Sequence, residues 1–188
     1  MSKPINKSKV DFRRLSKLIE EWDDKYSIKV GIIGDTAYQK HEHSDLSNAD
    51  LGAIHEFGAV KKDGTVIPQR SFLADSLLTS EGKRAIIKEV VKNNEAVAEL
   101  MKKPTGDEYD TAYREAVKKV VNPEMVANQI AIAALSRVQE AFTNDGFGKW
   151  EPTTEYSRQR RYGSPDNPTL VDTGQLRDSI SFEVKKNG

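Results

Sequence analysis

Cysteine is absent from this chain of 188 residues, which excludes disulfide bonds and thiol catalysis and fits a reducing compartment. Net charge is also absent, because 29 basic residues balance 29 acidic ones. The chain as a whole therefore has no attraction for nucleic acid or an anionic membrane, although a local patch of charge can still bind either. No apolar run reaches the length of a membrane span, and residues 1–14 are polar and basic without the apolar centre of a signal peptide.

Apolar periodicity predicts an α+β fold in a single domain over residues 1–188, since no flexible linker divides the sequence. Over residues 12–26, apolar side chains recur at steps of three and four, as on one face of a helix. Residues 28–32 and 180–184 alternate between apolar and polar side chains, as half-buried strands do. We expect these strands to share a small antiparallel or mixed sheet, packed against the N-terminal helix and long central helices.

The central helices are predicted between the two strands. A helical pattern runs from Phe72 to about Met101, and a second occupies residues 109–120. Asn122 is placed to cap a third helix, which has Pro123 in its first turn and extends to about Phe142. Residues 146–168 lack periodicity and are rich in turn formers, so we expect a long loop that contacts a partner.

Asp172-Thr173-Gly174 is the tripeptide of an aspartic protease active site. A protease half-site needs a flap and several strands after this tripeptide, and too few residues follow it here. Gln175 lies three positions after Asp172, which is the spacing of a capping box at the start of a helix. We therefore expect Asp172 to cap a turn that leads into the last strand.

Two weaker patterns point to a metal or a phosphate group. The three histidines and their acidic neighbours are His41, Glu42, His43, Asp45, His55 and Glu56. Their spacing fits no zinc motif, so a solvated polar loop is favoured over a metal-dependent hydrolase site. Gly31 and Gly34 follow the first strand as in a phosphate-binding loop, but the third glycine is missing and a role in strand packing is favoured.

The long loop holds a basic and aromatic segment. Its members are Lys149, Trp150, Tyr156, Arg158, Arg160, Arg161 and Tyr162. Alternating cations and aromatics are typical of grooves that bind single-stranded nucleic acid. Arginine and aromatic residues are also enriched at contacts between proteins. We favour a protein interface and keep nucleic-acid binding by residues 146–162 as the alternative.

Four separated motifs together resemble a known family. They are LGAIHEFG at 51–58, IPQRSFL at 67–73, GKWEP at 148–152 and LVDTGQLR at 170–177, the last followed by Ser179 and Ile180. In this order and spacing they are similar to the tail-completion and virion-morphogenesis proteins of tailed bacteriophages, which include head-tail joining, neck and minor tail proteins. The long helical stretch from Leu73 to Phe142, interrupted at Pro123, departs from the family pattern. The choice between terminator, tail-completion protein and neck adaptor therefore stays open.

This resemblance implies a structural virion protein without enzymatic activity, cofactor, metal or membrane contact. It implies a homo-oligomeric, hexameric ring in the virion tail or neck, assembled in the host cytoplasm. The implied partners are the tail tube and the head connector or neck proteins, with DNA only passing through the ring. The residues that we expect at subunit or partner contacts are Glu56, Phe57, Gly58, Ile67, Pro68, Arg70, Phe72, Trp150, Tyr156, Arg158, Arg161, Asp172, Gly174, Leu176 and Arg177.

Local chemistry gives some of these residues physical roles. Phe57 is expected to turn inward at the end of a short helix, where Gly58 can adopt a left-handed conformation. Pro68 lacks a backbone donor, so residues 67–72 are predicted to form an edge strand or extended arm. Arg70 would then point outward, and the edge would be available to a neighbouring subunit.

Overall fold

The computed structural model describes residues 25–94, 98, 122–164 and 166–187. In this part of the chain, eight helices and two antiparallel two-stranded sheets confirm the predicted α+β class. The predicted helices at 12–26 and 109–120 lie outside the described residues, except for Lys25, which lies in a turn, and Tyr26, which begins a strand instead. Among the helices that are described, none combines the length and apolar character needed to cross a membrane.

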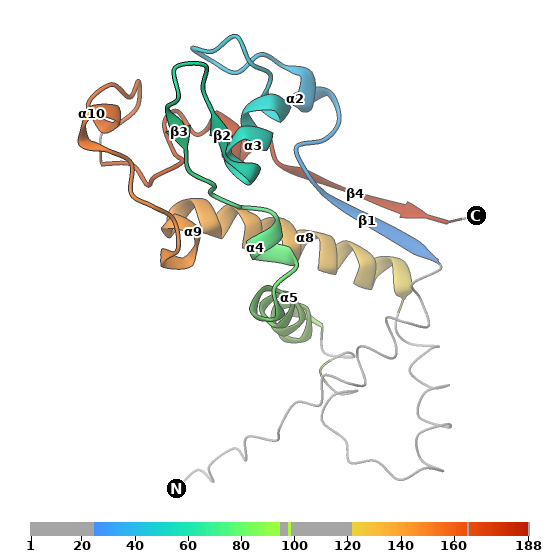
Figure 1. Ribbon diagram of the computed structural model, residues 1–188. Coiled ribbons are helices and arrows are strands. Elements are labelled where there is room, and N and C mark those ends of the chain that lie inside the picture. Colours follow the sequence, from blue (N-terminus) through green and yellow to red (C-terminus); the bar gives the residue numbers. More distant parts are fainter. Residues whose placement is uncertain (1–24, 95–97, 99–121, 165, 188) are drawn as a thin grey trace, which may run out of the picture.

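The first and last strands pair as the sequence predicts. Strand β1 (Tyr26–Gly31) and strand β4 (Ser181–Lys186) form an antiparallel ribbon in which Val30 lies opposite Phe182. Val30 packs against the buried core. Alternate side chains of a strand lie on the same face of the sheet, so this face of β1 is directed toward the core. The ribbon therefore brings the two ends of the described chain side by side (Figure 1).

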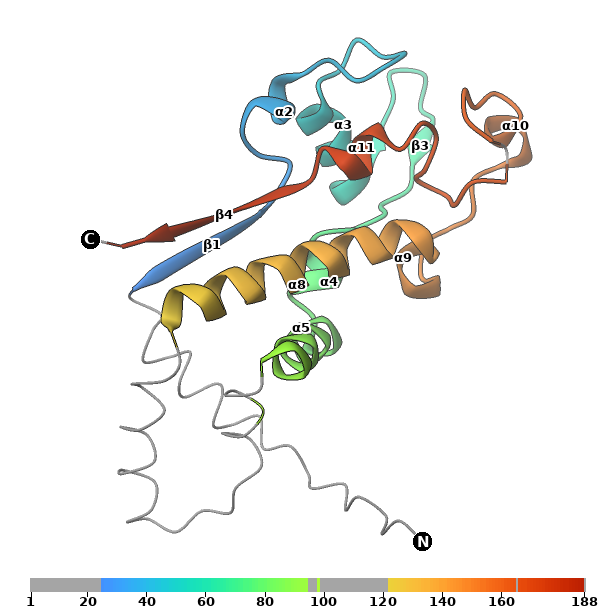
Figure 2. The ribbon, with the colours of Figure 1, turned by 180° about the vertical axis from the view of Figure 1, so that it is seen from behind.

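Helix α8 (Pro123–Thr143) lies at the centre of the molecule, with the β1–β4 ribbon on one side and helix α5 (Ser80–Asn93) on the other (Figures 1 and 2). The side chain of Asn122 accepts hydrogen bonds from the amides of Glu124 and Met125, and Pro123 occupies the first turn, as predicted. Small side chains let neighbouring elements approach this helix closely from both sides. Its buried residues are Val126, Ala127, Ala131, Ala133, Ala134, Val138, Ala141 and Phe142.

The continuous helix predicted from Phe72 is wrong, because the chain turns at Thr79. Helix α4 (Ala74–Leu77) is one turn long, and helix α5 (Ser80–Asn93) starts in a new direction. The Thr79 hydroxyl donates to the carbonyl of Asp75 at 2.9 Å and accepts from the amide of Gly82 at 3.1 Å. This side chain both ends α4 and caps α5, which apolar periodicity alone does not reveal.

The remaining elements surround the end of α8 that carries Phe142. They are α2 (Asp35–Tyr38), α3 (Asn48–Phe57), β2 (Ala59–Val60), β3 (Val66–Ile67), α9 (Asp145–Gly148), α10 (Glu155–Arg158) and α11 (Gln175–Asp178). Strands β2 and β3 form a hairpin that pairs Ala59 with Ile67. The predicted edge strand at 67–72 thus ends after one residue, and the chain continues without further strand pairing into α4.

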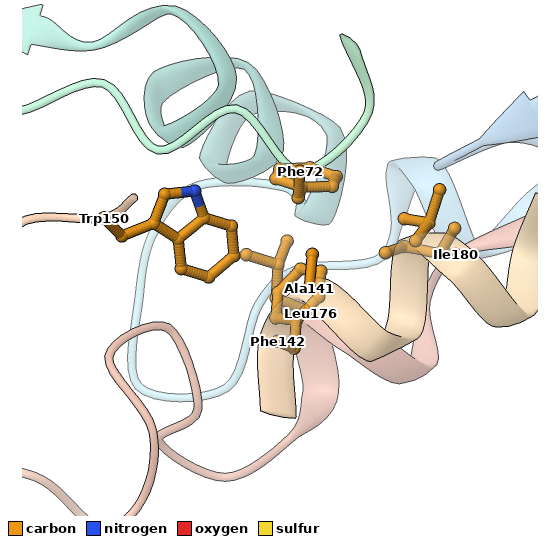
Figure 3. Packing of buried hydrophobic residues seen from close by; sticks show 7 residues of the cluster. Phe72, Ala141, Phe142, Trp150, Leu176 and Ile180 are labelled. Carbon is orange, nitrogen blue, oxygen red and sulfur yellow. The ribbon is translucent and has the colours of Figure 1, made fainter. Parts of the chain in front are cut away.

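One aromatic cluster joins these elements to α8 (Figure 3). The ring centroids of Phe72 and Phe142 are 5.1 Å apart, and those of Phe142 and Trp150 are 5.9 Å apart at an angle of 87°. Leu176 and Ile180 close the cluster from the C-terminal side. Residues from four distant segments therefore depend on one another for burial.

Candidate functional site

Glu56 is the buried link between the first two motifs. Its carboxylate accepts hydrogen bonds from the hydroxyl of Ser71 at 2.7 Å and from the amides of Phe72, Leu73 and Ala74 at 2.9, 2.9 and 3.0 Å. These amides belong to the entry of α4, where backbone N–H groups have no partner within the helix. The carboxylate thus fixes residues 71–74 onto the end of α3, and Glu56 is not available at the surface.

Phe57 and Gly58 end helix α3, as predicted, but Phe57 does not turn inward. Its side chain is 75% exposed, and Val60 and Val66 of the following hairpin are 71% and 66% exposed. Gly58 has φ 73° and ψ 169°, a conformation that favours glycine but is not the left-handed cap that the sequence predicts, and it leads directly into β2. The side chain of Phe57 points away because Glu56, one position earlier, occupies the buried direction.

Arg70 points inward, so the prediction of an outward arginine is wrong. Only 8% of the residue is exposed. Its Nε and Nη2 donate to the backbone carbonyl of Glu151 at 3.2 and 3.0 Å. Burial is the main cause that lowers the pKa of Arg70; the negative charge of Glu151 opposes this shift, and the positive charge of Arg161 adds to it. Because this side chain links the second motif to the third, charge reversal here would disturb the fold as well as any interface.

Trp150 belongs to the core rather than to an exposed contact loop. It is 6% exposed and packs edge-on against Phe142 (Figure 3). Gly146 has φ 63°, and a methyl group there would lie 2.2 Å from Nε1 of Trp150. The indole therefore needs glycine at this position. Its Nε1 has no hydrogen-bond partner within the described part of the chain.

The loop at 146–168 is held by its own chain, chiefly through Arg161. The guanidinium donates to the carbonyls of Asn167 and Thr169 at 2.6 and 2.7 Å and to the hydroxyl of Thr153 at 3.2 Å. The Thr153 hydroxyl also donates to the carbonyl of Thr169. The side chain of Arg161 thereby holds the segment at Thr153 and the segment at 167–169 together. Between these two segments, the side chains of Tyr156 and Arg158 in α10 are exposed.

Asp172 does not cap helix α11, which corrects the capping-box prediction. The helix begins after Gly174, which has φ 93° and supplies no side chain. The Asp172 carboxylate instead accepts from the amide of Gly163 at 2.7 Å. Gln175 reaches a different segment, where its Oε1 accepts from the amide of Glu42 at 2.6 Å and its Nε2 donates to Asn48 at 3.1 Å. No local spacing rule predicts either contact.

Replacing Asp172 with alanine should reduce the free energy of unfolding by about 1–2 kcal/mol, because the amide of Gly163 loses its partner. Asparagine retains an acceptor oxygen and should preserve most of the stability. Chemical denaturation measures the loss, and hydrogen exchange locates it. We expect faster exchange at Gly163 with little change at Arg177 in the alanine variant. Faster exchange confined to helix α11 would favour the capping interpretation instead.

Five of the predicted residues meet around one pocket with a volume of about 320 Å³. Arg70, Arg161, Asp172, Gly174 and Leu176 all line it. Helix α3 contributes Leu51 and His55 to the opposite wall, and Ser157 of α10 lies at the edge. The other predicted residues do not line this pocket: Glu56, Phe57, Gly58, Ile67, Pro68, Phe72, Trp150, Tyr156, Arg158 and Arg177.

Those other residues divide into core and surface groups. Phe72, like Glu56 and Trp150, is buried, whereas Ile67 and Pro68 are half-buried beside the β2–β3 hairpin. Arg177 turns toward its neighbour, with Nε 2.8 Å from a carboxylate oxygen of Asp178. The sequence motifs therefore contain both residues that hold the fold and residues that face the pocket, and the sequence does not distinguish them.

His55 is the pocket residue whose role the sequence does not predict. Burial, followed by the charges of Arg70 and His41, lowers its pKa from 6.5 to about 4. Its Nδ1 has no hydrogen-bond partner among the described residues. Elsewhere His43 stacks on Tyr162 with ring centroids 3.6 Å apart. Within the described ranges, no three histidine or acidic side chains are grouped to hold a metal ion, so the His41 to Glu56 cluster does not assemble.

The depressed pKa of His55 predicts a loss of stability in mild acid. The unfolded chain binds this proton near pH 6.5, but the folded chain binds it only near pH 4. Stability is therefore complete above pH 6.5 and should fall by about 3 kcal/mol as the pH drops to 4. Urea titrations between pH 5 and 7 should show a shallower pH dependence for His55→Gln. His43→Gln serves as the control, and an equal slope in wild-type protein and His55→Gln would contradict the assignment.

No model of a known protein family, no curated protein and no solved structure matches this chain.

Proposed function

We propose that this protein is a structural component of a tailed-phage virion. It would assemble as a homo-oligomeric ring, hexameric in the family that it resembles, at the neck or the head-proximal end of the tail. There it would join the tail tube to the head connector, with DNA passing through the ring. No catalytic step, cofactor or metal is part of this proposal.

The observation that carries this proposal is that the four motifs of the resemblance meet in one structural unit. Glu56 of the first motif binds the backbone of the second, and Arg70 of the second binds the backbone of the third. Trp150 of the third shares its core cluster with Leu176 of the fourth. Motifs that depend on one another for folding are expected to recur together in order, as the resemblance requires.

Exposed apolar side chains beside this unit offer a surface for self-association. Val60 and Val66 are opposite each other in the β2–β3 hairpin, and Phe57 ends the preceding helix. We call these three exposed side chains the hairpin patch. Large apolar side chains grouped on a surface favour protein contact, and a ring needs such a patch to meet a different surface of the next subunit.

Mass determination in solution combined with negative-stain imaging tests the proposal. Purified protein should form closed rings, and a Phe57→Ser, Val66→Ser double variant should shift the mass toward the monomer while its circular dichroism stays unchanged. Tyr38→Ser removes another exposed aromatic side chain and serves as the control. A wild-type protein that remains monomeric at high concentration, alone and with tail-tube protein, would contradict the ring.

Nucleic-acid binding is the second candidate, because Tyr156, Arg158 and Arg160 are exposed together at α10. The guanidinium carbon of Arg160 lies 4.9 Å from the ring centroid of Tyr156. Trp150 and Arg161 are occupied within the fold, which weakens the pattern predicted from sequence. Retention on a single-stranded oligonucleotide that decreases with salt, and that is lost in an Arg158→Ala, Arg160→Ala variant, would favour this candidate.

A further inference from the structure

Two partly buried arginines face the same pocket without an ion pair. Arg70 and Arg161 both line it, and all their hydrogen bonds go to neutral oxygens of carbonyl and hydroxyl groups. Neither guanidinium lies within 4.0 Å of a carboxylate in the described part of the chain. A cation that is removed from water without an anionic partner is unfavourable, so an anion that enters this pocket gains stabilisation from both.

The described residues that line the pocket carry more positive charge than negative charge. Asp172 is the only acidic side chain among the described residues that line it, and its carboxylate is engaged by the amide of Gly163. Asp145 also acts on both arginines through its charge, but one of its oxygens accepts from the amide of Thr169. His55 is neutral near pH 7. Glu151 also acts on Arg70 through its charge, but it does not line the pocket. Among the described residues that line the pocket, two guanidinium groups therefore face one carboxylate.

The pocket also has donors and apolar walls for an anionic group. No hydrogen bond is formed by Nη1 of Arg70 or by Nε of Arg161 within the described residues. Leu51, Leu170 and Leu176 supply aliphatic surface to the same pocket. Apart from histidines, no aromatic side chain lines it in the described part of the chain, so a nucleotide base would find no stacking surface.

We propose that this pocket binds a single carboxylate carried on a short aliphatic chain, with Arg70 and Arg161 as the groups that recognise it. Guanidinium and carboxylate groups form charge-assisted hydrogen bonds, which are strongest in sites shielded from water. The aliphatic chain of the ligand contacts the leucine side chains. The site goes beyond ring assembly, since it can be occupied in a monomer by a free carboxylate or in a complex by a glutamate side chain of another protein.

Three probes test this site in the full-length protein at constant ionic strength and pH 7. Butyrate represents a free carboxylate, N-acetylglutamate α-amide represents a glutamate side chain, and N-acetylglutamine α-amide is the matched neutral compound. Nitrogen-15 NMR titration should show saturable shifts at Gly163, Gly174 and the Arg161 Nε for the two charged probes. We expect dissociation constants on the order of 1 mM for ligands of this size.

Both arginines also hold backbone carbonyls, so the test leaves them unchanged and alters Ser157 at the pocket edge. Ser157→Glu places a carboxylate beside the guanidinium groups and should weaken binding of the charged probes roughly tenfold or more. Ser157→Gln has nearly the same shape without the charge and should retain binding. Both variants are at an exposed position of α10, so the fold should persist.

Each outcome either supports or overturns the inference. Tighter binding of the blocked glutamate would identify a protein side chain as the natural ligand, and tighter binding of butyrate a free carboxylate; both support the site. The inference is overturned if neither charged probe gives saturable shifts, if the neutral compound binds equally, or if Ser157→Glu has no effect. Stronger binding of inorganic phosphate or an oligonucleotide than of either carboxylate would overturn it as well. Ring formation can fail without changing any of these results.

Discussion

Replacing Glu56 with alanine should reduce the free energy of unfolding by roughly 3–5 kcal/mol, because a buried anion that serves four donors is lost at once. The amides of Phe72, Leu73 and Ala74 would be left without a partner at the entry of α4. Urea denaturation followed by circular dichroism measures the change. The Ser71 hydroxyl also loses its acceptor. Because Arg70 precedes Ser71 in the chain, we expect the loss of order at Ser71 to extend to Arg70.

Two further variants make this result specific. Glu56→Gln keeps one acceptor oxygen but presents an amide group to N–H donors, so its stability should lie between those of the wild-type protein and Glu56→Ala. Glu155→Ala removes a glutamate whose side chain is 72% exposed and should cost less than about 1 kcal/mol. If Glu56→Ala is no less stable than Glu155→Ala, the buried carboxylate does not hold the α4 entry.

Replacing Trp150 with alanine should destabilise the protein by about 3–5 kcal/mol, the usual effect of emptying a buried aromatic position. The indole fills the space between Phe142 and Gly146, and no neighbouring side chain can replace it. Trp150→Phe should cost considerably less, because Nε1 makes no hydrogen bond that the phenyl ring would lose. Thermal and urea unfolding of both variants provide the comparison.

The Trp150 variants also separate two interpretations of the third motif. The sequence alone predicts that Trp150 contacts a partner, in which case alanine would weaken association and leave the monomer stable. The structure predicts instead that alanine lowers the stability of the monomer itself. A Trp150→Ala monomer that unfolds at the same urea concentration as the wild-type protein would contradict the core assignment.

The regular elements were predictable because their signals are local. Alternation identifies both strands of the β1–β4 ribbon, and Asn122 followed by Pro123 marks the start of α8. The break at Thr79 was not predictable from apolar periodicity, since α4 and α5 continue almost the same pattern. A threonine that caps one helix while it ends another gives no stronger sequence signal than a threonine on a helix surface.

The directions and partners of individual side chains were not predictable from the sequence. Arg70 was expected outside because an extended segment presents alternate side chains to solvent, but the carbonyl of Glu151, distant in sequence, provides its partner. For His55 the sequence suggests a metal ligand, because the neighbouring histidines dominate the local pattern. Which donor meets which acceptor across the pocket depends on tertiary contacts, and neither hydrophobic period nor capping rules contain that information.

The β1–β4 ribbon has a consequence for the synthesis of this protein. Gly31 pairs with Ser181, so β1 leaves the ribosome long before its partner strand exists. At about 5–20 residues per second, the delay is roughly 8–30 seconds. During that interval the apolar face of β1 is uncovered, joined near its end by the matching face of α8, and such surfaces aggregate. Newly made chains should therefore need a holding chaperone, or fast translation, until β4 emerges and closes the sheet.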